Sequence, residues 1–373
     1  MKNDVLIYPY DSSFAPILRS NNFIDKFNEI HLCSLNGSGL CGKDASIADG
    51  GSALNLVVKK DFDALLSIVD TVIFTEVDSY IDFEWSLYPK IKMAIDAHKK
   101  IINLAPLSPQ IREELRINSI ENEVLFEDYS NNPDSTIDEI NCREGILNIN
   151  TPVIVVMGLS NSTGKFTTQI NIKKQLEESG YKISMIGSRS YCEFLGYHSF
   201  PNFMTERKFD DVEKIFLFNK YIKNIEKSEN PDVIVICIPG GIVPYDNKIH
   251  NNFGITAFLV SQAVVPDASV LCLFHEDFTA KYLELIGNTV KYRFGFEIDA
   301  YNISNRQIDW VEMVNAKPEK VRSSTINIKL IDKTIEKVNS LTTVPIYNLL
   351  SDKGDLTEML INKLSENSNS VVF

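Results

Sequence analysis

The sequence has no block of basic residues. It carries 37 Lys and Arg residues against 50 Asp and Glu residues, which gives a formal net charge of -13. A protein that follows a phosphate backbone or adheres to an anionic membrane needs a concentration of positive charge. We therefore expect no nucleic acid and no membrane among its partners.

Long apolar runs are also absent. No run approaches the roughly 20 apolar residues of a membrane-spanning helix. The first residues, Met1 to Pro9, pass directly into a short strand pattern without the hydrophobic region of a signal peptide. We expect a cytoplasmic protein, and the sequence leaves its oligomeric state open, a homo-oligomer included.

Cysteine pairs of the metal-binding or redox type are missing as well. None of the six cysteines forms a C-x-x-C pair or a Cys/His spacing that suggests zinc. Three of them lie in apolar, strand-like runs. We expect buried free thiols, as in a reducing compartment. The six are Cys33, Cys41, Cys142, Cys192, Cys237 and Cys272.

The 373 residues, 44% of them hydrophobic, suit a protein of two domains. In the first 120 residues short apolar runs alternate with helical patterns, which predicts a parallel sheet covered by helices. We predict a Rossmann-like domain at residues 1–120 and a polar, proline-bearing linker at 121–150. The expected strands and helices are Val5–Tyr8, Glu29–Ser34, Asp61–Val69, Thr71–Thr75, Ile81–Lys99 and Lys100–Leu104.

The same alternation resumes after residue 150. It predicts a P-loop NTPase-like α/β/α domain with a C-terminal extension at residues 151–373, so that the whole chain belongs to the α/β class. The expected elements are the strand Val153–Gly158 and the helix after it, then Lys182–Gly187, Phe209–Lys227, Val233–Ile238, Gly254–Ala263, Ser269–His275, Ile298–Ile303, Thr343–Leu349 and Asp355–Leu364.

The most specific motif of the chain follows the strand Val153–Gly158. A loop of small residues leads from Gly158 to Gly164 and Lys165, and an amphipathic helical pattern follows. Backbone N–H groups, the helix dipole and a lysine converge on one point in such a turn, which is how polyphosphate is bound. The candidate nucleotide-binding residues are Gly158, Ser160, Asn161, Ser162, Thr163, Gly164, Lys165, Phe166, Thr167 and Thr168.

The motif departs from the common form G-x-x-x-x-G-K-[ST] at two places. One extra residue lies between the glycines, and Phe166 stands where a Ser or Thr usually binds Mg²⁺. Thr167 or Thr168 would supply that hydroxyl only in a shifted helical register. The alternative is an ordinary glycine-containing turn with a lysine that faces solvent.

Charged residues at the ends of neighbouring strands are the other candidates, since ligands of open α/β sheets bind at the carboxyl ends of strands. Glu276 and Asp277 end one strand and would bind metal, with Thr167 beside them, or act as a general base; equally, they would only cap the next helix. Arg189 would clamp a phosphate or a substrate carboxylate, or form a surface salt bridge. Asp246 is a weaker candidate.

Two other nucleotide motifs are incomplete. Gly37-Ser-Gly39-Leu-Cys-Gly42 reads G-x-G-x-x-G, but Gly50 and Gly51 interrupt the helix that a dinucleotide site requires next. A flexible loop is the better interpretation. No Asn-Lys-x-Asp guanine motif is present, because Tyr221 and Ile222 follow Asn219-Lys220. We therefore expect ATP with Mg²⁺ rather than GTP or NAD.

The pattern G-x-x-x-x-x-G-K-x-T-T at Gly158–Thr168, behind a Rossmann-like domain, resembles a two-domain family. That family joins such a domain to a dethiobiotin-synthetase-like P-loop domain, and some members are linked to D-amino-acid N-acylation or peptide ligation. The resemblance extends through Asp232–Gly241 and Asp267–Glu276. The overall pattern is also similar to the peptide maturation system proteins of clostridia, encoded beside cysteine-rich ribosomal peptides and their radical maturases.

The resemblance implies an ATP-binding protein that assists peptide or amino-acid modification, through ATP-dependent carboxylate activation as a ligase or through hydrolysis as an ATPase. A precursor peptide and a maturation enzyme would then be its partners. The family carries a glutamate before its glycine turn, where this chain has Cys237-Ile238-Pro239. The alternative is therefore a non-catalytic, nucleotide-binding scaffold that recruits the precursor peptide or the maturase.

Overall fold

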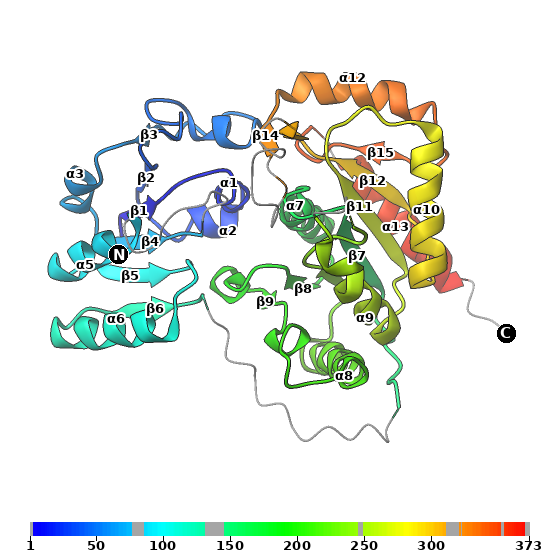
Figure 1. Cartoon of the computed structure of the whole chain (residues 1–373), viewed down its shortest axis with the longest axis horizontal. Coiled ribbons are helices and arrows are strands. Elements are labelled where there is room, and N and C mark those ends of the chain that lie inside the picture. Colours follow the sequence, from blue (N-terminus) through cyan, green and yellow to red (C-terminus); the bar gives the residue numbers. More distant parts are fainter. Residues whose placement is uncertain are drawn as a thin grey trace. The chain divides into compact units, whose positions relative to one another are not determined.

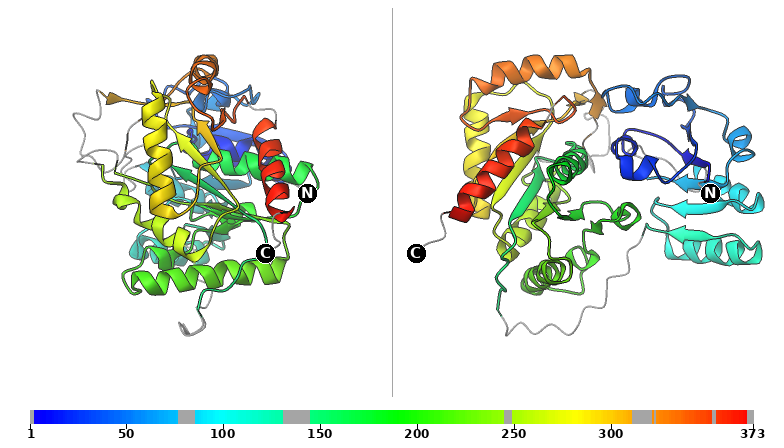
Figure 2. Two further views of the ribbon diagram at one scale, coloured as in Figure 1. Left: turned by 90° about the vertical axis from the view of Figure 1, so that its right-hand side faces the viewer. Right: turned by 180° about the vertical axis from the view of Figure 1, so that it is seen from behind.

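The computed structural model describes residues 3–76, 86–130, 145–244, 249–310, 321, 323–351 and 354–369. The chain divides into two compact units (Figures 1 and 2). The first consists of Met1–Asn132 with Ser190–Gly196, and the second of Pro133–Arg189 with Tyr197–Phe373. The first residues of the predicted helix Ile81–Lys99 lie outside the described residues. Asp246 and Cys142 also lie outside them.

The first unit contains a six-stranded parallel sheet in the order β3-β2-β1-β4-β5-β6, the order of a Rossmann fold. The strands are β1 Val5–Tyr8, β2 Ile30–Cys33, β3 Val58–Lys59, β4 Thr71–Phe74, β5 Lys100–Asn103 and β6 Phe126–Asp128. The helices are α1 Ala15–Leu18, α2 Asn21–Ile24, α3 Phe62–Leu66, α5 Tyr88–Asp96 and α6 Pro109–Glu121.

Local signals explain where the helices of this unit begin. The Asp61 side chain accepts the backbone N–H of Ala64 at 3.0 Å, and Ser108 caps α6 with Pro109 at its first position. Helices α3, α5 and α6 bury apolar side chains against β1 and β4, among them Phe62, Ile91 and Leu115. The first sheet therefore has the alternation of strand and helix that the sequence predicts.

Two features of this unit differ from the sequence-based expectation. Strand β6 lies within the predicted linker and pairs with β5, because Phe126 packs on the apolar face of the sheet. The segment Ser190–Gly196 also belongs to this unit, where the Phe194 ring lies 6.0 Å from Phe23 and 5.4 Å from Tyr129. A distant stretch of sequence therefore completes an aromatic cluster of the first unit.

The glycine-rich motif Gly37–Gly42 lies in turns after β2. The next helical segment is a short 3₁₀ helix, Ala45–Ala48, and the next described α-helix is α3. A dinucleotide fingerprint needs an α-helix N-terminus directly after its glycines. The motif therefore lacks the surroundings of a dinucleotide site.

The second unit contains a seven-stranded parallel sheet in the order β15-β12-β11-β7-β10-β8-β9. The strands are β7 Val153–Gly158, β8 Ile183–Gly187, β9 His198–Ser199, β10 Val233–Cys237, β11 Ala268–Leu273, β12 Ala300–Ile303 and β15 Ile346–Tyr347; β13 Arg306–Ile308 and β14 Ser323–Thr325 form a separate antiparallel pair. β7, β10 and β11 are buried throughout, as expected for central strands of a parallel sheet.

Helices cover both faces of this sheet, which makes the α/β/α arrangement predicted from the sequence (Figures 1 and 2). α7 and α13 lie on one face, whereas α8, α9 and α10 lie on the other. α10 is the helix expected after Glu276 and Asp277, for which no bounds were predicted, whereas α12 was not predicted; α12 packs through Ile331 and Val338. The helices are α7 Lys165–Glu178, α8 Asp211–Glu229, α9 Ile255–Ala263, α10 Ala280–Phe294, α12 Ile328–Asn339 and α13 Asp355–Asn369.

The strand order determines where a ligand of the second unit would bind. From β7 the chain passes to β8, two places away on one side, and later to β11 on the other side. The order therefore reverses at β7, and crevices in open α/β sheets form at the carboxyl ends of strands at such a point. The predicted phosphate loop begins there. None of the described helices is long and apolar enough to cross a membrane.

Candidate phosphate-binding site

The loop between β7 and α7 ends in a helix N-terminus that no side chain caps. Gly164 precedes the helix with a φ of 78° and, as a glycine, provides no side-chain cap. The first N–H groups of a helix have no partner within the helix, and the dipole makes this end positive. The start of α7 can therefore donate hydrogen bonds to an anion.

Gly158 has to lack a side chain for this loop to close. A Cβ atom at this position would lie 2.8 Å from Lys165 Cδ and still closer to Thr163 Oγ1. The aliphatic part of Lys165 instead passes directly over the end of β7. The first glycine of the motif thus makes room for the lysine of the motif.

Lys165 is buried and is held by two carbonyl groups. Its Nζ donates to the carbonyl of Ser160 at 2.8 Å and to that of Gly240 at 2.6 Å. Burial lowers the pKa of Lys165, and the positive charge of Arg189 lowers it further. An ammonium has three donors, so one remains for a ligand. The alternative interpretation, a lysine facing solvent, is wrong because the side chain is only 6% exposed.

Arg189 lies beside the first turn of α7. Its guanidinium carbon is 5.8 Å from the centre of the Phe166 ring, which is within the range of a cation–π contact. Phe166 is buried, so its ring is a fixed platform for the arginine. The residue that replaces the usual metal-binding hydroxyl therefore positions a second cation near the phosphate loop.

The two threonines after Phe166 have different surroundings. Thr168 is fully buried: its hydroxyl lies 3.0 Å from the Gly164 carbonyl and accepts a hydrogen bond from Asn302 at 3.0 Å. Its single proton is committed to the carbonyl, so this hydroxyl holds the helix to β12. Thr167 is half-buried, and its hydroxyl forms no hydrogen bond among the described residues.

Asn251 forms hydrogen bonds with two residues of the phosphate loop, Leu159 and Ser160. Its amide donates to the carbonyls of Leu159 at 3.2 Å and Val243 at 2.8 Å, and its side-chain oxygen accepts from Ser160 Oγ at 2.9 Å. Gly241 permits this approach, since a Cβ atom there would lie 2.6 Å from the Leu159 carbonyl oxygen. The Pro239-Gly240-Gly241 turn thus packs against the loop.

The backbone around Asn251 is left-handed over four consecutive residues. The φ angles are 46° at Asn251, 51° at Asn252, 52° at Phe253 and 67° at Gly254. Such a conformation costs free energy at non-glycine residues and is found most often where structure and function require it. Asn tolerates it better than most residues, because its short polar side chain forms local hydrogen bonds.

The polar residues at and after the ends of β10 and β11 differ in burial and in the groups that they contact. Cys237 ends β10; burial raises the pKa of its thiol, which bonds to Ser188. After β11, Asp277 is fully exposed and lies 3.6 Å from Lys337, whereas Glu276 is half-buried. His275 Nε2 contacts Thr334 at 2.8 Å and is turned toward α12. The structure separates the three polar residues that follow β11.

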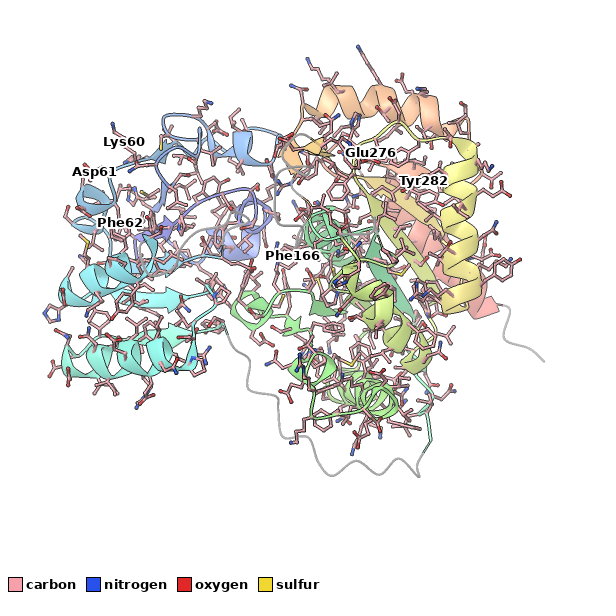
Figure 3. All side chains as sticks on the ribbon, viewed as in Figure 1. Lys60, Asp61, Phe62, Phe166, Glu276 and Tyr282 are labelled. Carbon is pink, nitrogen blue, oxygen red and sulfur yellow. The ribbon has the colours of Figure 1, made fainter. Side chains whose placement is uncertain are left out.

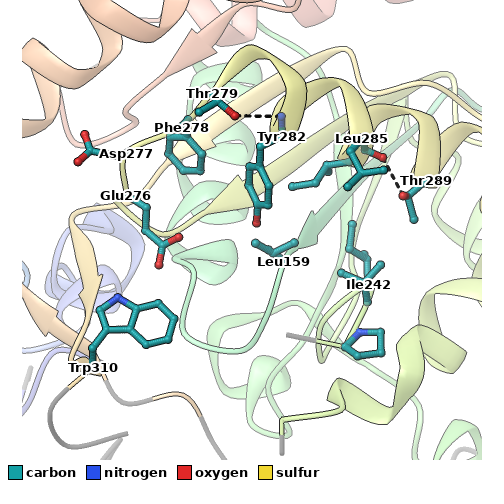
Figure 4. A pocket seen from close by; sticks show the side chains of 13 residues that line it. Leu159, Ile242, Glu276, Asp277, Phe278, Thr279, Tyr282, Leu285, Thr289 and Trp310 are labelled. Atoms are coloured by element: carbon teal, nitrogen blue, oxygen red, sulfur yellow. Dashed lines mark hydrogen bonds between the residues drawn. The ribbon is translucent and has the colours of Figure 1, made fainter. Parts of the chain in front are cut away.

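Glu276 lies on the wall of a cavity of about 650 Å³ next to the phosphate loop (Figures 3 and 4). Leu159, the first residue after Gly158, also lines this cavity. Most of the wall is apolar or aromatic and comes from the loop after β10, the end of β11, and α10. The principal side chains are Leu159, Ile242, Glu276, Phe278, Tyr282 and Trp310.

Sequence reasoning did not find Asn251 or this cavity. The run Asn251-Asn252-Phe253-Gly254 carries a signal, because two asparagines before a glycine favour left-handed turns. The cavity has no such signal, since its walls come from four separate stretches of the chain. Arg189 and Lys165, in contrast, were identified from their positions after buried strands.

No protein-family model matches the chain, and no curated protein is significantly similar to it in sequence. The fold is similar to that of a DUF1611 family protein from Anabaena variabilis. The TM-score is 0.62 at 10% identity, over 96% of this chain and 99% of that one. This likeness confirms the two-domain α/β fold. The signal recognition particle receptor FtsY from Elizabethkingia anophelis matches with a TM-score of 0.26 at 16% identity, over 65% and 75% of the chains.

Proposed function

We propose that the second unit binds the phosphates of a nucleoside triphosphate, ATP, on the loop Gly158–Thr168. The observation that supports this most is the position of Lys165. It lies at the switch point of a parallel sheet, beside an uncapped helix N-terminus, with Arg189 nearby. Two cations beside the N-terminus of α7 favour a polyanion.

The donor set also fits Mg²⁺ brought by the nucleotide. Among the described residues, no three His, Cys, Asp or Glu side chains gather into a metal-binding group. Mg²⁺ keeps several waters and usually takes one or two protein ligands together with substrate phosphates. We propose Thr167 as that ligand. Glu276, the other candidate from the sequence, lines the apolar cavity, and we assign it to the substrate.

We further propose that the bound nucleotide serves the modification of an amino acid or a peptide, by activation of a carboxylate. Lys165, Arg189 and the first N–H groups of α7 would hold the phosphates, and the cavity beside Leu159 would hold the molecule to be modified. When bound, Mg²⁺ would neutralise charge on the transferred phosphoryl group. The cavity supports this proposal because it adjoins the loop and has apolar walls.

The test is nucleotide binding and turnover by the full chain. ATP with Mg²⁺ should raise the melting temperature, and Lys165→Ala should abolish the shift, because a ligand of the native state stabilises it. Lys174→Ala is the matched control, since Lys174 is on the same helix, is only half-buried and pairs with Glu178. Release of ADP or AMP would support the enzyme. Equal shifts for both variants would refute the nucleotide site.

A scaffold that binds nucleotide without turnover is the second candidate. The observation that favours it is the end of β10, where the buried thiol of Cys237 is followed by Ile238 and Pro239 and no acid stands before the glycine turn. Such a protein would recruit a precursor peptide or its maturation enzyme. Tight ATP binding without release of ADP or AMP, together with co-purification of the peptide, would support it. Rapid hydrolysis would exclude it.

A further inference from the structure

The first unit has a cavity of its own at the carboxyl ends of β1, β2 and β3. Its volume is about 300 Å³, at the lower end of the range for small-molecule pockets. Tyr8 ends β1, Ser34 follows β2 and Lys60 follows β3, so three neighbouring strands bring side chains to one place. Figure 3 shows Lys60, Asp61 and Phe62 together at the start of α3. Open α/β sheets bind their ligands at the carboxyl ends of strands.

Tyr8 contributes a hydroxyl without a partner to this cavity. The residue is only 7% exposed, and its hydroxyl forms no hydrogen bond within the described part of the chain. The ring is fixed edge-on against Phe62, with the ring centres 4.8 Å apart, and against Phe74. Burial, with Cys33 and Asp63 nearby, raises the pKa of Tyr8 to about 12, so the group is a neutral donor at pH 7. A buried phenol hydroxyl usually has a hydrogen-bond partner, so this one is available to a ligand.

Lys60 and Asn36 add further donors at the edge of the cavity. Both side chains are exposed, and neither forms a hydrogen bond or an ion pair with any residue that the structure describes. Lys90 differs from them, because its ammonium donates to Asp63 at 2.7 Å and lies 4.8 Å from the centre of the Phe62 ring. Together with the tyrosine hydroxyl, the ammonium and the amide favour a carboxylate, which accepts hydrogen bonds through two oxygens.

Acceptors are scarcer in this cavity. Asp61 Oδ1 accepts the backbone N–H of Ala64 at 3.0 Å, and the second oxygen of Asp61 has no hydrogen bond from the described residues. The charge of Asp63 is balanced by Lys90. The Ser34 hydroxyl donates its only proton to a backbone carbonyl at 2.6 Å. Asp61 is therefore the anionic acceptor open to a ligand, and it suits a hydroxyl, because a second anionic group would be repelled.

We propose that this cavity binds a small hydroxycarboxylate, a monoanion with one carboxylate and a hydroxyl on a neighbouring carbon. Lys60, Asn36 and the Tyr8 hydroxyl donate hydrogen bonds to the carboxylate. Asp61 accepts the hydroxyl proton of the ligand. The site belongs to the first unit, so the proposal does not depend on the nucleotide site proposed for the second.

Racemic glycerate, glycerol and propanoate test the proposal by titration calorimetry on the full chain at pH 7, without nucleotide. The compounds share a three-carbon skeleton; glycerol lacks the carboxylate, and propanoate lacks the hydroxyls. We expect glycerate to bind at least about tenfold more tightly than either, as hydrogen bonds to charged groups imply. Equal affinities for glycerate and propanoate, or binding of none of these compounds, would overturn the proposal. L-Serine, with an ammonium in place of the neighbouring hydroxyl, would also overturn it by binding more tightly than glycerate.

Variants of the donors locate the carboxylate of the ligand. Tyr8→Phe keeps the ring and removes the hydroxyl, and it should weaken glycerate about tenfold. Lys60→Ala removes an exposed cation, so it should weaken glycerate and propanoate by up to about fivefold and leave glycerol unchanged. Lys59→Ala is the matched control, because Lys59 is exposed beside Lys60 and does not line the cavity. Unchanged glycerate affinity in both donor variants would contradict the proposal.

Asp61→Asn locates the hydroxyl of the ligand. An asparagine still caps α3 through its side-chain oxygen, so the fold of the unit should be kept. The variant loses the charged acceptor, and the preference for glycerate over propanoate should therefore fall from about tenfold toward parity. A preference that stays at its wild-type value would refute the role of Asp61 and with it the hydroxycarboxylate.

Discussion

Ser160 and Asn251 are joined by a hydrogen bond of 2.9 Å from the serine hydroxyl to the asparagine side-chain oxygen. Ser160 belongs to the phosphate loop, and Asn251 belongs to a left-handed segment that precedes α9. The same asparagine also donates to the Leu159 carbonyl. The loop conformation therefore depends on a residue from a distant part of the sequence.

Replacement of Asn251 by Ala should loosen the phosphate loop. The change leaves the Leu159 and Val243 carbonyls and the Ser160 hydroxyl without their partner, and buried polar groups left unpaired cost about 1–3 kcal/mol. The free energy of unfolding in urea should fall by that amount, and ATP should bind more weakly.

Asn252→Ala is a matched control for this variant. Asn252 is also left-handed, with a φ of 51°, but it is exposed and its side chain does not reach the loop. Both variants lose an asparagine from a strained backbone, so only their difference reports the hydrogen bonds. Equal losses of stability would show that Asn251 contributes only its backbone conformation.

The buried ammonium of Lys165 should make stability depend on pH. Its pKa is lowered in the folded state, so between that pKa and the ordinary value the unfolded chain binds more protons. Stability contributed by this group is least at neutral pH and rises as pH increases toward about 10.4. The free energy of unfolding, measured for wild type and Lys165→Met at several pH values, should diverge in favour of wild type as the pH rises.

The quantity to follow is the difference in free energy of unfolding between wild type and Lys165→Met at each pH. Cys237 and Cys272 also titrate in the folded state at raised pKa values, but both proteins contain them. Their contribution largely cancels in the comparison. A difference that stays constant from pH 7 to pH 10 would mean that Lys165 is not buried as a charged group.

A side chain at Gly158 should destroy the phosphate loop. The Cβ atom of Gly158→Ala would lie 2.8 Å from Lys165 Cδ, so the lysine or the strand end has to move. Overpacking of this kind costs about 1–3 kcal/mol. ATP should no longer raise the melting temperature of this variant.

Gly287→Ala is the control for a glycine of the same unit. Gly287 lies inside α10, and a Cβ atom there would meet only the Tyr301 hydroxyl, at 3.7 Å. Alanine in a helix interior is favoured over glycine by about 0.5–1 kcal/mol. This variant should be slightly more stable than wild type and should keep the ATP-induced shift; loss of that shift would mean that the phosphate loop is not the binding site.

NAD and NADP should leave the melting temperature unchanged. The glycines of Gly37–Gly42 lie in turns after β2, and the 3₁₀ helix Ala45–Ala48 follows them instead of an α-helix. The pyrophosphate would therefore meet no helix N-terminus. A ligand at one hundred times its dissociation constant stabilises the native state by about 2.7 kcal/mol, so a shift with NAD would be easy to detect.

The strands of the second sheet and the start of α7 could be predicted because their signals are local. β7 is a continuous apolar run, and Gly164 with Lys165 marks the point where the helix begins. α12 was missed although it carries local signals, the Asn327 cap and the apolar spacing of Ile331, Ile335 and Val338, whereas β6 could not be predicted. β6 has only three residues, all half-buried, and its strand conformation depends on pairing with β5.

The sequence by itself determined the alternation of strands and helices, the α/β class and the place of the phosphate loop, because each depends on residues adjacent in the chain. Only the tertiary structure decided how that loop is held. The partners of Lys165 and Ser160, Gly240 and Asn251, come from the stretch after β10, and Glu276 meets Trp310 and Tyr282 across a cavity. Hydrogen bonds and cavities between distant segments depend on the strand order, which no local pattern encodes.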